Sequence, residues 1–295
     1  MGKHAYLIIA NRNQRQLQIL LDTLDDSRND IFLLTDEKSL LAKMKFKVNF
    51  SSMYRLQSMN IYWGSYSQIE AELALFKVAA MTSNYDYYHL LSGMDLPLTN
   101  QDKIHNFFDN NPNKEFITYS AINDADRLSI RLHNYVFDKN FRSNNKLFNL
   151  INKVQFFVYK DKGQHRVSKD KVCFGSNWVS LENKLVKSLI TNEEEIYQIF
   201  HNGYLVDELM IPIYLNLHPK FKKNIYWSKP VHDKPNEFQG NLRYINWWDG
   251  SPYTWKLKDY SKLEDALEKG HLFARKFDEN IDNNIIVKIA NNILK

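Results

Sequence analysis

Two adjacent carboxylates, Asp207 and Glu208, lie inside the otherwise apolar run GYLVDELMIPIYL, residues 203–215. Moving an ionised carboxylate out of water without a partner is costly, so the pair needs a role. Pro212 is poorly tolerated beyond the first helical turn, which predicts that a helix begins near Asp207 or kinks near Pro212. Neighbouring helical side chains point about 100° apart, so the two acids cannot serve one site in the same way. With Asp207 as the helix cap, Glu208 falls in the first turn and can face a cleft. Local chemistry alone favours two acids that stabilise the helix N-terminus.

A second acidic group is the triplet DAD, Asp124 to Asp126, which follows the apolar segment EFITYSAIN. In many nucleotide-sugar transferases a D-x-D after a strand holds a divalent cation on the diphosphate, and carboxylate oxygens suit Mg²⁺ or Mn²⁺. Arg127 could instead pair with Asp126. Because such triplets are common by chance, we favour an exposed loop and keep the metal site as an alternative.

A basic cluster brackets a predicted helix in the aromatic-rich C-terminal region and consists of Lys256, Lys258, Arg275 and Lys276. Such lysines are often simply solvated. Alternatively, fixed cations at this place would neutralise a leaving diphosphate where no metal is bound. Spacing alone does not distinguish the two interpretations.

The elements that must position these groups alternate along the first 120 residues. Short apolar runs predict buried strands, and periodic segments predict helices between them, at residues 5–10, 13–24, 30–36, 67–83 and 85–92. This order predicts an α/β fold with a mostly parallel, Rossmann-like sheet flanked by helices, and a ligand at the carboxyl ends of its strands. We find no internal repeat, and a single domain over 1–295 is expected.

The second half of the chain is less regular. Residues 121–170 are polar, basic and poorly periodic, which predicts exposed loops, notably RSNN (142–145) and YKDKGQHRVSKDK (159–171). A short strand in VCFGSNWVSL, helices over about 181–217 and two C-terminal helices follow.

Composition and missing motifs narrow the class of protein. The 295 residues carry a net charge of +5, which suits an anionic partner. With nine glycines there is no G-x-G-x-x-G after the first strand and no Walker motif, and neither H-E-x-x-H nor G-x-S-x-G occurs. Cys173 is the single cysteine, which excludes an intrachain disulfide. The first apolar run is too short for a signal peptide, and we expect a cytoplasmic protein.

Six segments in order resemble the core-2/I-branching β-1,6-N-acetylglucosaminyltransferase family, which includes the peptide xylosyltransferases. They are AYLIIANRNQRQLQILLDTLDDSRNDIFLLTDEKS, YWGSYSQIEAEL, YDYYHLLSGMDLPLTN, FGSNWVSL, VDELMIPIYL and LRYINW…GSPY…HLFARKFD. The resemblance leaves out only about residues 121–165, and it departs from the family at Val206, where the family has proline.

The resemblance implies a GT-A type fold and inverting transfer from a UDP-sugar, without a metal or other cofactor. It implies that 1–120 form the nucleotide-sugar-binding half and 121–295 the acceptor-binding and catalytic half. The resemblance implies that Glu208 is the catalytic base. It implies donor-binding roles for Asp36, Lys256, Arg275 and Lys276, and acceptor-binding roles for Asp95 and Trp247. The resemblance therefore moves Glu208 from helix stabilisation to catalysis.

A soluble bacterial-type member of this family is expected to transfer a sugar, GlcNAc by preference, to a glycan or lipid-linked oligosaccharide in surface polysaccharide synthesis. Two alternatives remain: a metal-dependent transferase that uses Asp124 and Asp126, and a non-catalytic binder of glycan or nucleic acid. If the protein is a glycosyltransferase, no nucleic-acid partner is expected. The C-terminal isoleucines Ile285, Ile286, Ile289 and Ile293 could touch a membrane surface, although a helix packed on the domain is the favoured interpretation.

Overall fold

The computed structural model describes residues 2–141, 145–160 and 166–294. Its strands are β1 His4–Ala10, β2 Asn29–Thr35, β3 Ser52–Arg55, β4 Tyr87–Ser92, β5 Asp95–Pro97, β6 Ser180–Glu182, β7 Arg243–Ile245 and β8 Phe273–Arg275. Its α-helices are α1 Gln14–Leu24, α2 Ser67–Thr82, α3 Gln101–Asp109, α4 Ala125–Ser129, α5 Lys146–Lys160, α6 Asn183–Thr191, α7 Glu193–Phe200, α8 Asp207–Leu217, α9 Pro219–Lys222, α10 Tyr260–Glu268 and α11 Glu279–Ile293.

The central sheet has the strand order β3-β2-β1-β4-β6. All neighbouring pairs are parallel except β4 and β6, which are antiparallel. The expected α/β class with a mostly parallel sheet is confirmed. Because β1, β2 and β4 run in the same direction, their carboxyl ends meet at one edge of the sheet, where a ligand is expected.

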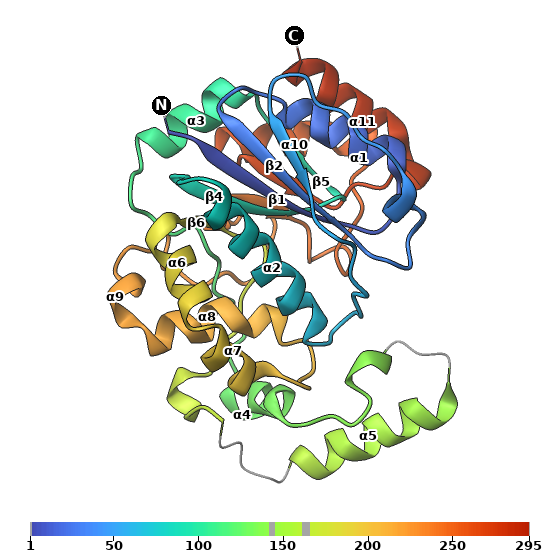
Figure 1. Ribbon diagram of the computed structural model, residues 1–295, viewed down its shortest axis with the longest axis vertical. Coiled ribbons are helices and arrows are strands. Elements are labelled where there is room, and N and C mark those ends of the chain that lie inside the picture. The colour runs from blue at the N-terminus through green and yellow to red at the C-terminus, as the bar shows by residue number, and fades with distance from the viewer. Residues whose placement is uncertain (1, 142–144, 161–165, 295) are drawn as a thin grey trace.

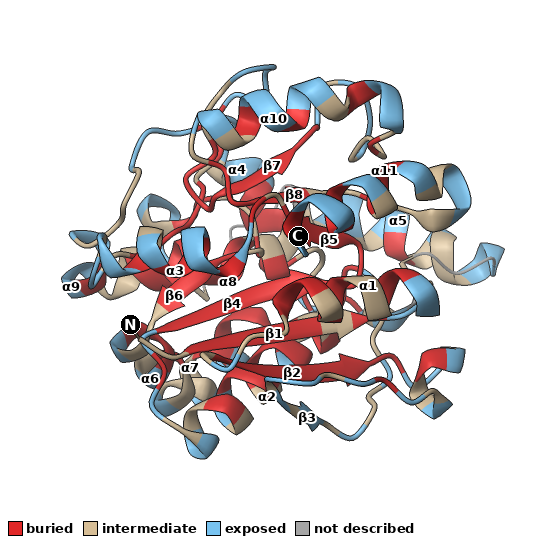
Figure 2. Cartoon of the chain, turned by 90° about the horizontal axis from the view of Figure 1, so that it is seen from above, coloured by how far each residue is buried: buried red, intermediate tan, exposed pale blue. Residues whose placement is uncertain are grey.

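Helices cover both faces of this sheet (Figure 1), with α2, α6 and α8 on one side and α1, α10 and α11 on the other. Successive strand residues point to opposite faces, so Leu7 packs with the first group and Ile8 with the second. Figure 2 shows β1, β2 and β4 as almost wholly buried between these layers, whereas the edge strand β3 is mostly exposed. The continuous apolar runs that predicted β1 and β2 are therefore explained by burial on both faces.

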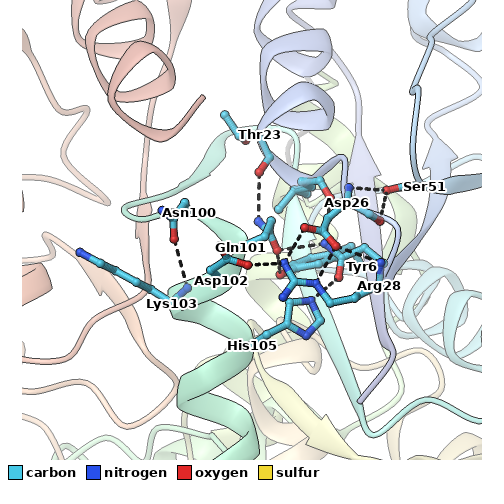
Figure 3. A network of polar contacts seen from close by, with 12 residues as sticks. Tyr6, Thr23, Asp26, Arg28, Ser51, Asn100, Gln101, Asp102, Lys103 and His105 are labelled. Atoms are coloured by element: carbon cyan, nitrogen blue, oxygen red, sulfur yellow. Dashed lines mark hydrogen bonds and ion pairs between the residues drawn. The ribbon is translucent and has the colours of Figure 1, made fainter. Parts of the chain in front are cut away.

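A polar network ties the helices to the amino ends of β1 and β2, away from the expected ligand edge (Figure 3). Gln101 at the start of α3 accepts a hydrogen bond from the Tyr6 hydroxyl at 2.9 Å and donates to the Thr23 carbonyl at 3.0 Å. Arg28 bridges Asp26 and Asp102 at 2.6 and 2.8 Å. These contacts satisfy polar groups that the sheet would otherwise leave unpaired.

A second, smaller sheet has the order β5-β8-β7 and brings the C-terminal segment back to the end of β4. Asp95 of β5 pairs in register with Arg275 of β8, and Phe277 donates its N–H to the Met94 carbonyl. The predicted donor-binding segment around Arg275 therefore lies where the carboxyl end of β4 leaves the central sheet.

Helix α8 begins at Asp207, as the sequence predicts, and continues through Pro212. A proline has no N–H, so the carbonyl of Glu208, four residues earlier, lacks its helical donor. The N–H of Gly175 donates to this carbonyl instead, at 3.0 Å. A side chain at Gly175 would not fit, because its Cβ would lie 2.0 Å from the Thr118 carbonyl oxygen.

The structure contradicts part of the prediction for residues 121–170 and confirms the prediction for the C-terminal helix α11. The loops predicted over 121–170 are wrong in part, since this region contains α4 and α5, while residues 142–144 and 161–165 lie outside the described residues. Ile285, Ile286, Ile289 and Ile293 of α11 are buried, which confirms the packed helix. Over the described ranges, no helix combines the length and apolar character needed to cross a bilayer.

Replacing Gly175 with alanine should lower the free energy of unfolding by about 1–3 kcal/mol, because the added methyl group overlaps backbone that cannot move away alone. Chemical denaturation measures this loss. Gly2→Ala is the matched control, since its Cβ would meet only the movable side chain of Asp86, and it should change stability by less than about 0.5 kcal/mol. Equal stability of the two variants would contradict the close approach.

Candidate active site

A cavity of about 450 Å³ opens at the first turn of α8. Its wall includes three of the residues that the sequence predicts for the site, Glu208, Trp247 and Arg275, together with Asp207. Glu208 comes from α8, Trp247 from the loop after β7, and Arg275 from the end of β8. The fold therefore brings together Glu208 and Arg275, which are 67 positions apart in the sequence.

Glu208 forms an ion pair with Arg131, whose Nη1 donates to its Oε2 at 3.0 Å. The two side chains remain 26% and 22% exposed, so the pair borders the cavity instead of being sealed beneath it. Burial raises the pKa of Glu208, and the Arg131 charge and hydrogen bond oppose this effect. The nearby negative charge of Asp233 raises the pKa further. Glu208 is therefore a positioned carboxylate with a proton affinity above its ordinary value.

Asp207 is more deeply buried and turns toward α2. Its Oδ2 accepts a hydrogen bond from Gln68 Nε2 at 2.9 Å, whereas its Oδ1 has no hydrogen-bond partner among the described residues. Val206, not Asp207, occupies the N-cap position, so the expectation that Asp207 caps α8 is wrong. The reason is that α2 packs against α8 and offers Gln68 as a side-chain partner.

A third acid, Glu72 of α2, lies behind this pair and is fully buried. Its Oε1 accepts a hydrogen bond from Asn177 Nδ2 at 3.0 Å. Burial raises the pKa of Glu72 well above its ordinary value, and the charge of Asp207 adds to the shift. Burial likewise raises the pKa of Asp207, and the negative charge of Glu208 raises it further. Asp207 and Glu72 each accept a hydrogen bond from a neutral amide, whereas Glu208 borders the cavity and is paired with the cation Arg131.

Arg275 is fixed in the cavity wall by an ion pair. Its Nη1 lies 2.8 Å from Oδ1 of Asp95, which is fully buried, and it also contacts the Ser92 hydroxyl. The guanidinium stands over the ring of Trp178, 4.5 Å from the ring centre, in a cation–π contact. These three contacts hold a cation beside the carboxyl end of β4.

The other predicted residues do not line this cavity. Asp95 is fully buried and pairs with Arg275, so it lies behind the cavity wall. Asp36 directly follows β2 and pairs with Lys38 at 2.9 Å. Lys276 adjoins Arg275, and its carbonyl accepts from the Trp255 N–H, next to Lys256. Lys256 and Lys276 are both half-buried.

Aromatic rings make up much of the remaining wall. Trp63, Phe174, Trp178 and Trp247 all border the cavity, and Trp247 is partly exposed. Flat apolar rings beside carboxylates and amides suit a sugar, which presents both C–H faces and hydroxyl groups.

The DAD triplet has local structural contacts. Asp124 caps α4 by accepting a hydrogen bond from the Arg127 N–H at 3.1 Å, and Asp126 pairs with Lys169. Both acids are exposed and are not part of the cavity wall. Within the described ranges, no group of three or more His, Cys, Asp and Glu side chains is arranged to hold a metal.

Sequence reasoning missed Arg131, Gln68 and Asp233. Arg131 lies in the region without resemblance and 77 residues from Glu208, so no local spacing pointed to it. Asp233 follows an irregular segment and has a positive φ of 56°, which the sequence does not reveal. Trp178 stood in the recognised FGSNWVSL segment, and its aromatic type was the available indication.

Comparison with known proteins gives the family. The family model described as "Branch: Core-2/I-Branching enzyme" matches residues 4–265. Among solved structures, the apo form of mouse xyloside xylosyltransferase 1 aligns at 12% identity over 92% of this chain and 96% of that chain, with a TM-score of 0.38. Such a distant likeness carries no argument about the site. No curated protein sequence matches the chain significantly.

The family match covers most of the chain, and the parallel sheet with helices on both faces agrees with the GT-A type fold that the resemblance implied. The chain therefore belongs to the Core-2/I-Branching enzyme family of glycosyltransferases.

Proposed function

We propose that the protein transfers a sugar, GlcNAc by preference, from a UDP donor to a hydroxyl of a glycan acceptor, with inversion at the anomeric carbon. The observation that carries this proposal is the joint presence of Glu208 and Arg275 in one aromatic-lined cavity. One is a carboxylate with a raised pKa, and the other is a fixed cation. A direct displacement requires these two functions, a base for the incoming hydroxyl and a positive charge for the departing phosphate.

In the proposed reaction, Glu208 takes the proton of the acceptor hydroxyl while its oxygen attacks C1 of the donor sugar. The bond from C1 to the UDP oxygen breaks as the new bond forms, and UDP leaves with the bonding electron pair. Arg131 keeps Glu208 ionised and oriented before the acceptor arrives, through the contact at 3.0 Å. One base suffices, because an inverting transfer needs no covalent intermediate.

The donor side is proposed to use the cations around β8. Arg275 and Lys276 would bind the diphosphate, together with Lys256, which directly follows the residue whose N–H donates to the Lys276 carbonyl. Asp36 after β2 would contact the uridine. Asp95 is assigned a different role from the one expected, because its buried ion pair positions Arg275. The proposed reaction runs without a metal, since these cations carry the charge that a metal would otherwise neutralise.

The acceptor is proposed to stack on Trp247, which lies partly exposed on the cavity wall. A glycan or lipid-linked oligosaccharide of surface polysaccharide synthesis in the cytoplasm is the proposed acceptor. Sugar stacking on an exposed ring tolerates different glycans, and a panel of acceptors would define the linkage.

Glu208→Gln should reduce kcat by about 10²–10⁴-fold and leave UDP affinity nearly unchanged, because only the proton acceptor is lost. UDP release from a panel of UDP-sugars, with UDP-GlcNAc expected to be the best donor, measures the rate, and calorimetry measures UDP binding. Glu70→Gln on the exposed surface of α2 is the control and should retain full activity. A Glu208→Gln enzyme with ordinary turnover would eliminate Glu208 as the base.

Arg131→Gln should move the acid limb of the kcat/KM profile to higher pH by about one unit or more, because an adjacent cation stabilises the ionised form of a carboxylate. The sign follows from the base role: Glu208 must be ionised, activity rises with pH through its pKa, and removal of Arg131 raises that pKa further. Arg127→Gln, the neighbouring exposed arginine, should leave the profile in place. A loss of activity with an unshifted acid limb would show that Arg131 is merely structural.

Excess EDTA should leave transfer at its full rate, and Asp124→Asn with Asp126→Asn should retain activity, because both acids make contacts outside the cavity. Initial rates with EDTA, and with Mn²⁺ added back, measure the effect. A strict Mn²⁺ requirement, together with loss of activity in the double variant, would instead support the metal-dependent mechanism.

A further inference from the structure

Helix α5 presents an apolar surface to solvent, here named the α5 face. It consists of Leu147, Leu150, Val154, Phe157 and Val158, whose exposed fractions lie between 40% and 70%. At about 100° per residue these five side chains fall within roughly 100° of the helix circumference. A helix of a globular protein normally turns such an arc toward the core. Here the arc points outward.

The opposite side of α5 is held to the protein by specific contacts. Asn152 Nδ2 donates to the Phe137 carbonyl at 3.2 Å, and the Tyr159 hydroxyl donates to the Asn134 carbonyl at 2.6 Å. The rings of Phe148 and Phe137 stack with their centres 4.5 Å apart. These contacts fix the orientation of the helix and, among the residues that the structure describes, leave the α5 face exposed to solvent.

The charge beside the α5 face has one sign. Residues 145–160 contain three lysines and no Asp or Glu. Lys146 and Lys153 are exposed and seven residues apart, so they form a row along one border of the apolar arc. Lysines that flank an apolar stripe are the pattern of helices that lie in the headgroup region of an anionic bilayer.

The position of α5 fits this surface. Figure 1 shows it at the opposite end of the long axis from α11. On its other side it forms part of a second cavity, of about 760 Å³, that also includes Arg131 and Leu205. Leu205 also borders the cavity that contains Glu208, so the two cavities adjoin.

We propose that the α5 face docks the protein on an anionic phospholipid surface, with its apolar side chains at the boundary between headgroups and acyl chains and its lysines on the phosphates. Fifteen residues span about 22 Å as a helix, too short to cross the bilayer, so α5 lies in the interface. The buried isoleucines of α11 are not accessible for this contact. If the proposed function also holds, docking brings the catalytic cavity close to a lipid-linked acceptor.

A lipid surface fits better than a second copy of the chain. Two α5 faces packed on each other would bring rows of lysines together without an acid within residues 145–160 to compensate them. Anionic headgroups supply that compensation, and an apolar interior accepts the exposed side chains.

Sedimentation with vesicles tests the proposal without any substrate. The full-length protein should bind phosphatidylcholine vesicles that contain phosphatidylglycerol, and it should bind weakly to phosphatidylcholine alone. Leu150→Asp with Phe157→Asp should lower partitioning by at least about tenfold, and Lys146→Glu by several-fold. Leu40→Asp with Met81→Asp, two apolar residues elsewhere that are even more exposed, is the matched control and should bind as the unaltered protein does.

Absence of binding to anionic vesicles, or equal losses in the α5 and control variants, would overturn the proposal. So would a dimer in light scattering that the α5 substitutions dissociate, because the face would then be a contact between copies. Activity on a soluble acceptor separates this test from the proposed function. The α5 variants should transfer sugar normally there, whereas a failure of the Glu208 experiment would leave vesicle binding unchanged.

Discussion

One backbone hydrogen bond joins two segments that line the cavity containing Glu208. Because Pro212 has no N–H, the carbonyl of Glu208 is available to the N–H of Gly175, at 3.0 Å. Gly175 belongs to the segment that also contributes Phe174 and Trp178 to the cavity wall. Pro212 is unfavourable inside a helix, but here it frees a carbonyl of the first turn of α8. That carbonyl then accepts a hydrogen bond from the segment that forms the aromatic wall. The placement of Glu208 depends on this contact.

The two arginines of the site, Arg275 and Arg131, form ion pairs that differ in burial. Arg275 is tied to Asp95, which is fully buried, so its charge stays in place throughout a reaction cycle. Arg131 pairs with Glu208 at the cavity border, where both side chains retain access to solvent. A base must exchange partners when its substrate arrives, and a phosphate-binding cation must not move. This difference supports the proposed roles, in which Glu208 is the base and Arg275 binds the phosphate.

Much of the fold could be predicted because buried parallel strands are continuous apolar runs, as in residues 5–10 and 30–36. The start of α8 was predictable for a similar local reason, the position of Pro212. The partners of the acids were not predictable, since Arg131 and Gln68 reach α8 only through tertiary packing. Helix α5 was mistaken for loop because its apolar residues occur in a lysine- and asparagine-rich segment, and they face solvent, where a core cannot explain them.

The most direct test of the proposed site is a crystal structure of the protein with UDP. The proposal predicts that the diphosphate contacts Arg275 and Lys276, that the uracil lies near Asp36, and that Glu208 faces the open position beyond the β-phosphate where C1 of the sugar would stand. A diphosphate bound at Asp124 and Asp126 through a metal, or bound away from the cavity that contains Glu208, would contradict it.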